Sequence, residues 1–307
     1  MVIDLRQELI QKISQYIPND RILIQEPMRL HTTFRVGGPA ALYVELKTEQ
    51  EFRDILTLLN AKEEDYFIVG NGSNLLISDT GYDGIILHPS KEFNDVRVEG
   101  EKLICESGAA LSTIARAALE HELTGFEFAS GIPGSLGGAI VMNAGAYDGE
   151  MKKVVESVRL VTPQGEVITK SCEEMDFSYR HSILKEEPYV VLSVTIKLQK
   201  GDKSQIKARM DELAAMRREK QPLEYPSAGS TFKRPEGYFA AKLIEDAGLR
   251  GFQVGGAQVS EKHCGFVINK ENATAQDICE LMKQVQVQVQ DKFGVLLEPE
   301  VIRIGDF

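Results

Sequence analysis

The 307-residue chain lacks features that membrane-bound and secreted proteins need. No apolar run approaches the roughly 18 residues of a membrane span. The first residues, Met1–Arg6, include an acidic side chain and lead into no apolar core of the kind that signal peptides contain. We therefore expect a cytoplasmic protein that does not bind a membrane.

Cysteine is scarce and scattered. The four cysteines form no CxxC pair, so the sequence indicates neither a metal site nor a disulfide framework. Each is expected to be a small buried hydrophobe with a reduced thiol, as is typical of the cytoplasm. These residues are Cys105, Cys172, Cys264 and Cys279.

Positive charge is also in deficit. The 35 Lys and Arg residues stand against 46 Asp and Glu residues, which gives a net charge of -11. Broad, sequence-independent binding of nucleic acid needs a basic surface, so this balance argues against it. A local basic pocket for an anionic ligand remains compatible with the sequence. The composition implies no protein partner.

The length predicts about two domains, and the pattern of the sequence changes near residue 200. Apolar spacing predicts helices over 4–17, 49–60, 111–122 and 202–219. Strands are expected over 41–46, 65–70, 75–78, 84–88, 95–98, 102–106 and 188–199, with a hairpin over 153–170 that turns at 163–165. Beyond residue 219, strands and helices alternate to the end.

A glycine-rich loop, Gly70-Asn71-Gly72-Ser73-Asn74, directly follows an expected strand. Glycine tolerates positive φ and lets a ligand approach the backbone, and successive N–H groups can then cradle a phosphate. A plain turn between two strands is the alternative interpretation of this loop.

A second stretch, from Gly125 to Gly149, holds seven glycines around the run Gly131-Ile132-Pro133-Gly134-Ser135-Leu136-Gly137-Gly138-Ala139. Helix interiors disfavour such density, so we expect backbone in special conformations against a large cofactor. Neither stretch is a Walker A loop, and neither carries Gly-x-Gly-x-x-Gly at a strand–helix turn.

Eight segments, in order along the chain, together resemble one family, the MurB-type UDP-N-acetylenolpyruvoylglucosamine reductases, which are flavoenzymes of peptidoglycan precursor synthesis. The length resembles the family's shorter subclass, and the tyrosine-bearing loop that covers the substrate in the longer subclass has no counterpart. The segments are Thr33–Gly38, Gly70–Asn74, Gly131–Ala139, Asn143–Tyr147, Tyr179-Arg180, Gly229–Lys233, Phe266–Asn269 and Glu298–Val301.

The resemblance implies an α+β fold: a two-subdomain FAD-binding fold of the PCMH or vanillyl-alcohol-oxidase type, with a separate α/β substrate domain. The FAD-binding region would span 1–199, as subdomains 1–85 and 86–199. Residues 200–298 would bind the sugar nucleotide, and 299–307 would return to the flavin region.

The implied reaction is the reduction of the enolpyruvyl ether of UDP-N-acetylglucosamine to UDP-N-acetylmuramate, which serves cell-wall biogenesis and hence cell shape and division. NADPH reduces FAD, hydride passes from flavin N5 to C3, and a serine gives a proton to C2. Val36–Ala40 contains no histidine that could attach the flavin, so FAD is expected to be non-covalent, and His31 to be structural. No metal is implied.

Residue roles follow from matching positions in the family. Arg180, Ser230 and Glu300 match the catalytic arginine, the proton donor and the catalytic glutamate, and Glu298 competes with Glu300 for its role. We expect Glu300 to be partly protonated beside the enolate. No role is assigned to His263 or Cys264.

The resemblance also implies residues that bind the two ligands. Substrate contacts are expected from Lys220, Arg217, Lys233, Arg234 and Tyr179. Cofactor contacts are expected from Gly70, Asn71, Gly72, Ser73, Asn74, Gly131, Ile132, Gly134, Gly137, Gly138, Asn143 and Gly145.

Two other functions remain open. A flavin-dependent oxidase of the same fold would share the glycine loops, but it would not need Gly-Ser-x-Phe-Lys together with the terminal Pro-Glu-Val. A non-catalytic nucleotide-binding protein would have no use for Arg180, Ser230 and Glu300 together.

Overall fold

The structure is a computed structural model that describes residues 2–307, and it divides into two compact units. Unit 1 contains the chain up to Ile24, together with Leu42–Gly70 and Gly84–Ala214. Unit 2 contains Gln25–Ala41, Asn71–Asp83 and Ala215–Phe307. Each unit is thus assembled from three separate chain segments. No helix within residues 2–307 is both long and apolar enough to cross a membrane.

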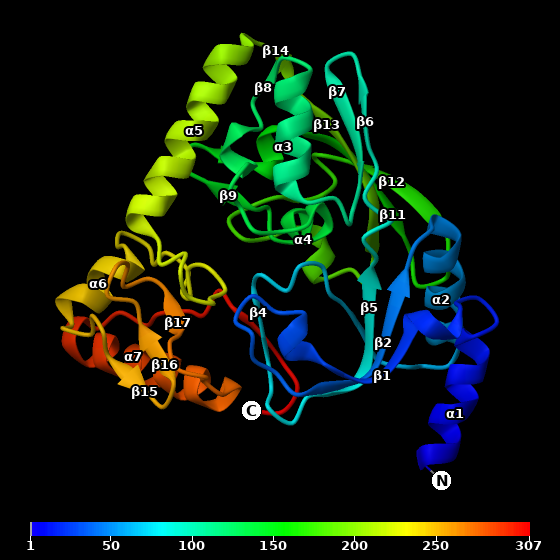
Figure 1. The fold of residues 1–307 in the computed structure, drawn as a ribbon, viewed down its shortest axis with the longest axis horizontal. Coiled ribbons are helices and arrows are strands. Elements are labelled where there is room, and N and C mark those ends of the chain that lie inside the picture. The colour runs from blue at the N-terminus through cyan, green and yellow to red at the C-terminus, as the bar shows by residue number, and fades with distance from the viewer. Residues whose placement is uncertain (1) are drawn as a thin grey trace. The chain divides into compact units, whose positions relative to one another are not determined.

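An antiparallel five-stranded sheet forms the larger part of unit 1, in the order β12-β11-β13-β7-β6 (Figure 1). Helices α3 and α4 pack against it and enclose a core of alternating strand residues such as Leu103, Cys105 and Val158. The bounds are β6 Val96–Glu99, β7 Lys102–Glu106, β11 Val155–Val161, β12 Val167–Ser171, β13 Val190–Lys197, α3 Leu111–Glu120 and α4 Leu136–Val141.

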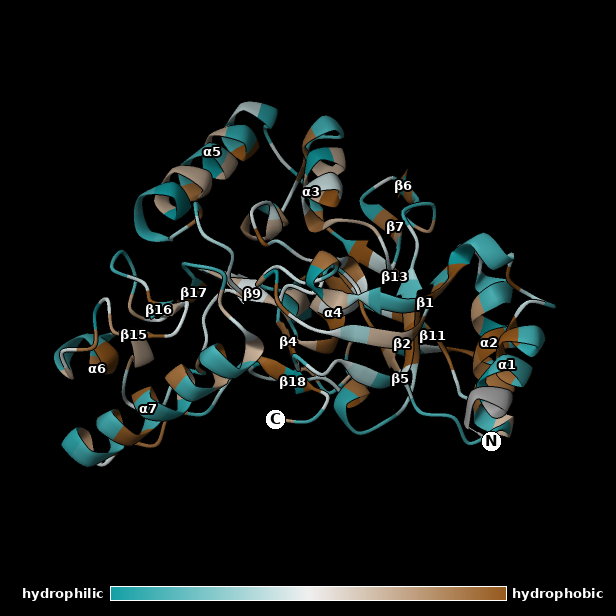
Figure 2. Ribbon diagram, turned by 60° about the horizontal axis from the view of Figure 1, so that its bottom comes forward, coloured by the Kyte–Doolittle hydropathy of each residue, from teal (hydrophilic) through white to brown (hydrophobic). Residues whose placement is uncertain are grey.

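A second sheet of unit 1 has the order β1-β2-β5-β3 and packs against helices α1 and α2. Helix α2 begins after Thr48, whose side chain accepts a hydrogen bond from Glu51 N–H, and buries one face through Phe52, Ile55 and Leu59. Figure 2 colours this apolar side brown. The bounds are α1 Val2–Ile13, β1 Ile22–Pro27, β2 Pro39–Leu46, α2 Glu49–Ala61, β3 Tyr66–Ile68 and β5 Tyr82–Pro89.

Unit 2 joins a three-stranded antiparallel sheet, helices α6 and α7, and a parallel pair of strands from distant parts of the chain. Helix α7 carries a capping box at Thr274, and the Asp79 carboxylate accepts hydrogen bonds from Ala275 and Gln276 N–H. The bounds are β4 Leu75–Ile77, α6 Ala240–Asp246, β15 Gln253–Val254, β16 Ala257–Val259, β17 Val267–Asn269, α7 Ala275–Phe293 and β18 Ile302–Ile304.

The helices and strands expected from apolar spacing up to residue 219 are confirmed, mostly to within a few residues. The helix expected over 4–17 ends at Ile13, because residues 14–16 turn ahead of Pro18. Up to residue 219, the sequence did not indicate four two-residue strands, which are too short for any periodicity. These are β8 Leu123–Thr124, β9 Gly145–Ala146, β10 Gly149–Glu150 and β14 Gln199–Lys200; the expected charged helix is α5 Lys203–Lys220.

A half-buried ion pair ties α2 to the start of β1. The Arg21 guanidinium contacts both Glu51 carboxylate oxygens, at 2.9 and 2.6 Å, in the two-point geometry that suits arginine. Burial by itself would raise the pKa of the Glu51 carboxyl. The Arg21 contact and the backbone amides of Lys47 and Thr48 outweigh burial and hold that pKa below its ordinary value.

We predict that Glu51→Gln lowers the free energy of unfolding by about 1.5–3 kcal/mol at neutral pH, because a hydrogen-bonded charge pair is lost. The folded-state pKa is depressed, so this stabilisation is present above the unfolded-state pKa of about 4.3 and is lost as pH falls below it. Urea unfolding at several pH values measures the effect.

Glu49→Gln is the matched control, because Glu49 lies on the same helix but pairs with Arg159 on the surface. An exposed pair contributes at most about 1 kcal/mol, so this variant should remain close to wild type. Equal losses for the two variants, or a loss for Glu51→Gln that does not shrink as pH falls below about 4.3, would contradict the assignment.

Candidate functional site

The first glycine-rich loop is shaped by its own chain. Gly72 has a φ of 59°, as expected for a glycine loop, and it is buried. An added Cβ would overlap the carbonyl oxygen of His31, and Gly72 O accepts a hydrogen bond from Thr33 N–H at 3.2 Å. Glycine is therefore required at position 72 by the fold of unit 2, whatever the loop binds.

The second glycine-rich stretch differs from expectation in its backbone. We predicted special conformations there, but Gly131, Gly134, Gly137 and Gly138 all have ordinary φ values, and the last two lie inside the short helix α4. The prediction is confirmed at Gly125, Asn143 and Tyr147, which have φ values of 115°, 40° and 56°. It was wrong for the central glycines, which allow close approach and do not need positive φ. A Cβ on Gly137 would lie 3.1 Å from the Cβ of Ser107, and Gly137 N–H donates to Ser107 O at 2.8 Å.

The two glycine-rich stretches meet within unit 1. A Cβ on Gly70 would collide with the hydroxyl of Ser135, the residue that precedes α4. Main-chain hydrogen bonds also join Leu136 N–H to Ala109 O and Leu111 N–H to Gly134 O, at 2.9 and 3.1 Å. The start of α4 is thus held tightly between two neighbouring segments.

Two features of this region fit a cofactor lying against the main chain. The Ser107 hydroxyl is buried in a residue that is 2% exposed, and it has no hydrogen-bond partner among the described residues. Gly138 is exposed, and an added Cβ would meet only the Ser135 hydroxyl, at 3.6 Å. A buried hydroxyl without a partner costs free energy, which a ligand group can recover. Sequence reasoning missed Ser107, although its position directly after strand 102–106, before Gly108, was a usable signal.

Asn143, predicted to contact the cofactor, uses its side chain inside the protein. It is 1% exposed, and its amide donates to Glu150 Oε2 and to Ser178 O, both at 3.0 Å. Its side-chain oxygen accepts from Lys152 N–H at 2.9 Å. Asn143, with a φ of 40°, therefore ties the end of α4 to the turn that contains Arg180. Gly145 lies in the β9–β10 pair, where a Cβ would crowd Gly149 and Glu150.

Arg180 stands at the tip of a two-residue turn. Ser178 and His181 exchange main-chain hydrogen bonds of 3.2 Å, which leaves Tyr179 and Arg180 at the tip. The φ of Arg180 is 55°, a left-handed conformation that costs a residue with a Cβ about 1–2 kcal/mol. Its guanidinium lies 5.1 Å from the ring of Tyr179, which is 54% exposed. Such strain is typical of functional positions.

Ser230 lies on an anchored segment of unit 2. Gly229 before it has a φ of 76°, and Thr231 after it is fully buried. Thr231 N–H donates to Gly265 O at 2.8 Å, and its hydroxyl accepts from Val267 N–H at 2.9 Å. The exposed Ser230 therefore sits between a left-handed glycine and a residue fixed by several bonds.

The two glutamates of the final segment have different surroundings. The Glu298 side chain is 68% exposed and pairs with Lys233, whose Nζ lies 3.0 Å from Glu298 Oε2. Glu300 is half-buried, and its N–H donates to Thr231 O at 2.8 Å while its carbonyl accepts from the Asn74 amide at 3.0 Å. The structure thus brings the main chains of Glu300 and Thr231 together, next to Ser230.

The remaining expected substrate residues lie on unit 2, apart from Tyr179. Lys220 is exposed on the last turn of α5, whereas Arg217 on the same turn is only 6% exposed. The Arg234 guanidinium lies 4.0 Å above the ring of Phe239, and its Nε donates to Tyr238 O at 3.3 Å. Of the catalytic trio, Arg180 belongs to unit 1, and Ser230 and Glu300 belong to unit 2.

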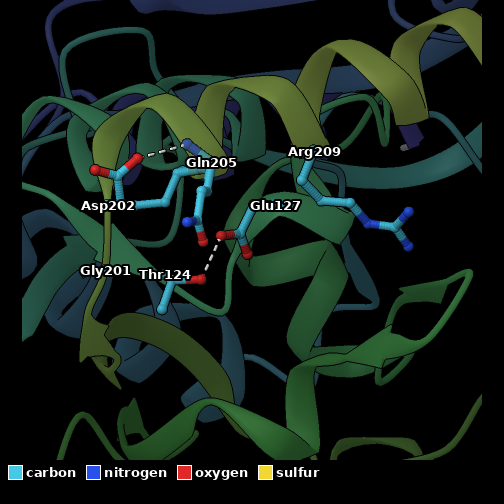
Figure 3. Close-up of a pocket in the computed structure, with 7 residues that line it drawn as sticks. Thr124, Glu127, Gly201, Asp202, Gln205 and Arg209 are labelled. Carbon is cyan, nitrogen blue, oxygen red and sulfur yellow. Dashed lines mark hydrogen bonds between the residues drawn. The ribbon is translucent and has the colours of Figure 1, made fainter.

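A pocket of about 390 Å³ in unit 1 contains none of the predicted residues (Figure 3). Its two carboxylates are already engaged. Glu127 accepts from the Thr124 hydroxyl at 2.6 Å and from Gly125 N–H at 2.8 Å, and Asp202 accepts from Gln205 N–H at 3.0 Å at the start of α5. We assign this pocket no role.

Two family models match the chain. The model described as UDP-N-acetylenolpyruvoylglucosamine reductase, C-terminal domain, matches residues 221–304, and the model described as FAD binding domain matches residues 40–171. The UDP-N-acetylenolpyruvoylglucosamine reductase of Caldanaerobacter subterraneus subsp. tengcongensis is 51% identical to this chain over 298 residues, which cover 97% of this chain and 98% of the relative.

Solved structures agree with these matches. The crystal structure of the reductase MurB from Thermus caldophilus superposes with a TM-score of 0.80 at 33% identity, covering 92% of this chain and 98% of that one. The crystal structure of p-cresol methylhydroxylase matches with a TM-score of 0.50 at 13% identity, and the match covers 94% of this chain and 64% of the methylhydroxylase chain. At this low identity, the likeness shows the fold alone. The chain thus has the predicted α+β fold of the PCMH or vanillyl-alcohol-oxidase type, with an FAD binding domain.

Gly138→Ala should separate cofactor binding from folding. Alanine in a helix is more stable than glycine by roughly 0.5–1 kcal/mol, and the new Cβ makes only an ordinary protein contact, so the flavin-free variant should unfold no more easily than wild type. We expect its affinity for FAD to fall at least about 10-fold, because the methyl group would occupy space against the cofactor. Urea unfolding of the flavin-free protein and a fluorescence titration with FAD measure the two effects.

Gly72→Ala provides the contrast. There the new Cβ strikes His31 O at a positive φ, so the flavin-free protein itself should lose stability. A Gly138→Ala variant that binds FAD with wild-type affinity would remove α4 from the flavin site.

Proposed function

This chain belongs to the family of UDP-N-acetylenolpyruvoylglucosamine reductases, and on that basis we propose that it catalyses the NADPH-dependent reduction of UDP-N-acetylglucosamine enolpyruvate to UDP-N-acetylmuramate. The observation that carries the proposal is the anchoring of Ser230 and Glu300 on paired segments of unit 2, in a chain whose other half matches an FAD binding domain. A protein that only binds nucleotides needs no such arrangement.

Non-covalent FAD would be held by the main chain around α4, with the buried Ser107 hydroxyl supplying a polar contact. When bound, FAD would supply the hydride chemistry at C3 of the enolpyruvyl group, with NADPH as the source of the hydride. The protein's own contribution is to position the substrate and to stabilise the charge that develops at C2 and in the carboxylate.

Arg180 is proposed to bind the enolpyruvyl carboxylate. Its planar guanidinium can donate two parallel hydrogen bonds to a carboxylate, and a fixed cation stabilises the negative charge that spreads into that group as the enolate forms. The strained turn supports this role, because the φ of 55° holds the arginine where a glycine would be more stable.

Ser230 is proposed to donate the proton to C2. A hydroxyl is a weak acid, but a developing carbanion is a strong base, so transfer is feasible when the geometry is fixed. Glu300 in its protonated form would hydrogen-bond to the enolate. The pairing of Glu298 with Lys233 at the surface favours Glu300 over Glu298 for this role.

The diphosphate of the sugar nucleotide needs positive charge in an otherwise acidic protein. Lys220 is an exposed cation on the last turn of α5, and we propose that it contacts the diphosphate directly. Arg217, which is 6% exposed, and Arg234, whose Nε donates to Tyr238 O, would add to the local positive potential. Tyr179, exposed beside Arg180, is proposed as a further substrate contact.

Ser230→Ala should affect the two half-reactions, reduction of the flavin and its reoxidation, to different extents. Reduction of the bound flavin by NADPH requires no hydroxyl donor, so bleaching in rapid-mixing traces should stay near the wild-type rate. Reoxidation by the enolpyruvyl sugar nucleotide should slow by about 10²–10⁴-fold, because C2 loses its proton source. Ser230→Cys keeps an exchangeable proton and should recover part of this rate.

Glu300→Ala and Glu298→Ala are a matched pair for the same measurement. We expect slower reoxidation for Glu300→Ala, because the donor to the enolate is lost, and a near-normal rate for Glu298→Ala. If Ser230→Ala slows both half-reactions equally, the serine positions ligands instead of giving a proton, and undiminished reoxidation would remove it from the mechanism.

A further inference from the structure

The main chain of Glu300 is held from both sides. On one side, its N–H donates to the carbonyl of Thr231 at 2.8 Å. On the other, its carbonyl accepts from the side-chain amide of Asn74 at 3.0 Å. One anchor is thus the neighbour of Ser230, and the other belongs to the glycine-rich loop 70–74.

The first anchor is rigid. Thr231 is fully buried, and its N–H donates to the carbonyl of Gly265. Its hydroxyl accepts from Val267 N–H, and its carbonyl accepts from Glu300 N–H. The segment around Phe232 pairs with the segment around Pro299, and Lys233 N–H donates to Glu298 O at 2.8 Å. Proline has no N–H, so residue 299 adds no donor of its own to this pairing.

The second anchor depends on a side chain. Just beyond Glu300, Ile302 N–H donates to Asn74 O at 3.0 Å, and a parallel ladder between β4 and β18 begins there. The Glu300 carbonyl lies before that ladder and is bound by the Asn74 amide, outside the main-chain pairing. A substitution at residue 74 can therefore remove the side-chain bond to the Glu300 carbonyl and still leave the ladder its main-chain bonds.

We propose that Asn74 is a positioning residue that fixes Glu300 relative to Ser230, in addition to any contact its loop makes with the cofactor. This inference rests on the proposed function of Glu300. The glycine-rich loop thereby sets the position of a catalytic side chain that lies 226 residues away in the sequence. A reacting group misplaced by about 1 Å can lose on the order of 10²-fold in rate.

The test compares Asn74→Ala with Asn269→Ala in protein saturated with FAD. Asn269 is a matched control from the same unit, because its amide also donates to a main-chain carbonyl, that of Phe34 at 3.0 Å, and its side-chain oxygen accepts from Ala273 N–H. We expect Asn74→Ala to slow reoxidation by the enolpyruvyl sugar nucleotide by about 10–100-fold more than it slows reduction by NADPH. Asn269→Ala should lower thermal stability without changing the ratio of the two rates.

A double-mutant cycle then tests whether Asn74→Ala slows reoxidation through Glu300. In a Glu300→Ala background, Asn74→Ala should slow reoxidation no further, because the group that it positions is gone. Equal slowing in both backgrounds would overturn the inference, and so would slowing of both half-reactions by the same factor. Asn74→Asp, which keeps the size of the side chain but has no N–H to donate, should behave as Asn74→Ala if the alanine variant folds poorly.

Amide hydrogen exchange gives a readout independent of turnover. Asn74→Ala should speed exchange in the 300–302 segment of the flavin-saturated protein, and Asn269→Ala should not. If Glu300→Ala itself leaves reoxidation unchanged, the proposed role of Glu300 fails, whereas the exchange result still decides whether Asn74 holds the segment. Unchanged exchange at 300–302 in Asn74→Ala would overturn the inference.

Discussion

A few main-chain hydrogen bonds in unit 2 hold together three segments that are far apart in the sequence: residues 74–77, 231–233 and 298–304. Bringing such distant segments together costs conformational entropy, and the free energy comes from the apolar core around α7. Glu300 lies on one of these segments, and Ser230, the proposed proton donor, directly precedes another. Their geometry therefore depends on the core of unit 2 more than on contacts between their own side chains.

In unit 1, the region proposed to bind ligands depends on backbone conformation and close packing. The start of α4 needs glycines that let it approach Ser107 and Ser135, and the turn at Tyr179-Arg180 needs a residue in a left-handed conformation. Asn143 links the two features through its bonds to Ser178 and Glu150. A buried hydroxyl without a partner and a strained arginine both lower the stability of the unliganded protein, which is consistent with a region shaped for ligands.

The sequence predicted local structure well where periodicity and capping determine it. The strand over 102–106 and the helix over 49–60 have clear apolar spacing, and Thr48 is a good N-cap. The glycines of 131–138 were misjudged, because a sequence does not distinguish a glycine needed for φ from one needed for close packing. Only the fold reveals the bond between Asn74 and Glu300, since no local pattern connects residues 226 positions apart. The roles of Arg180, Ser230 and Glu300 came from family resemblance, and the structure adds the strain and anchoring of these residues.

The proposed transfer of hydride and a proton to an enolpyruvyl sugar nucleotide is tested most directly by turnover with NADPH and UDP-N-acetylglucosamine enolpyruvate in D₂O, with the product analysed by NMR. We predict that NADPH oxidation depends on the enolpyruvyl substrate, and that UDP-N-acetylmuramate forms with solvent deuterium at C2. NADPH oxidation at the same rate without that substrate, or a product without deuterium at C2, would contradict it.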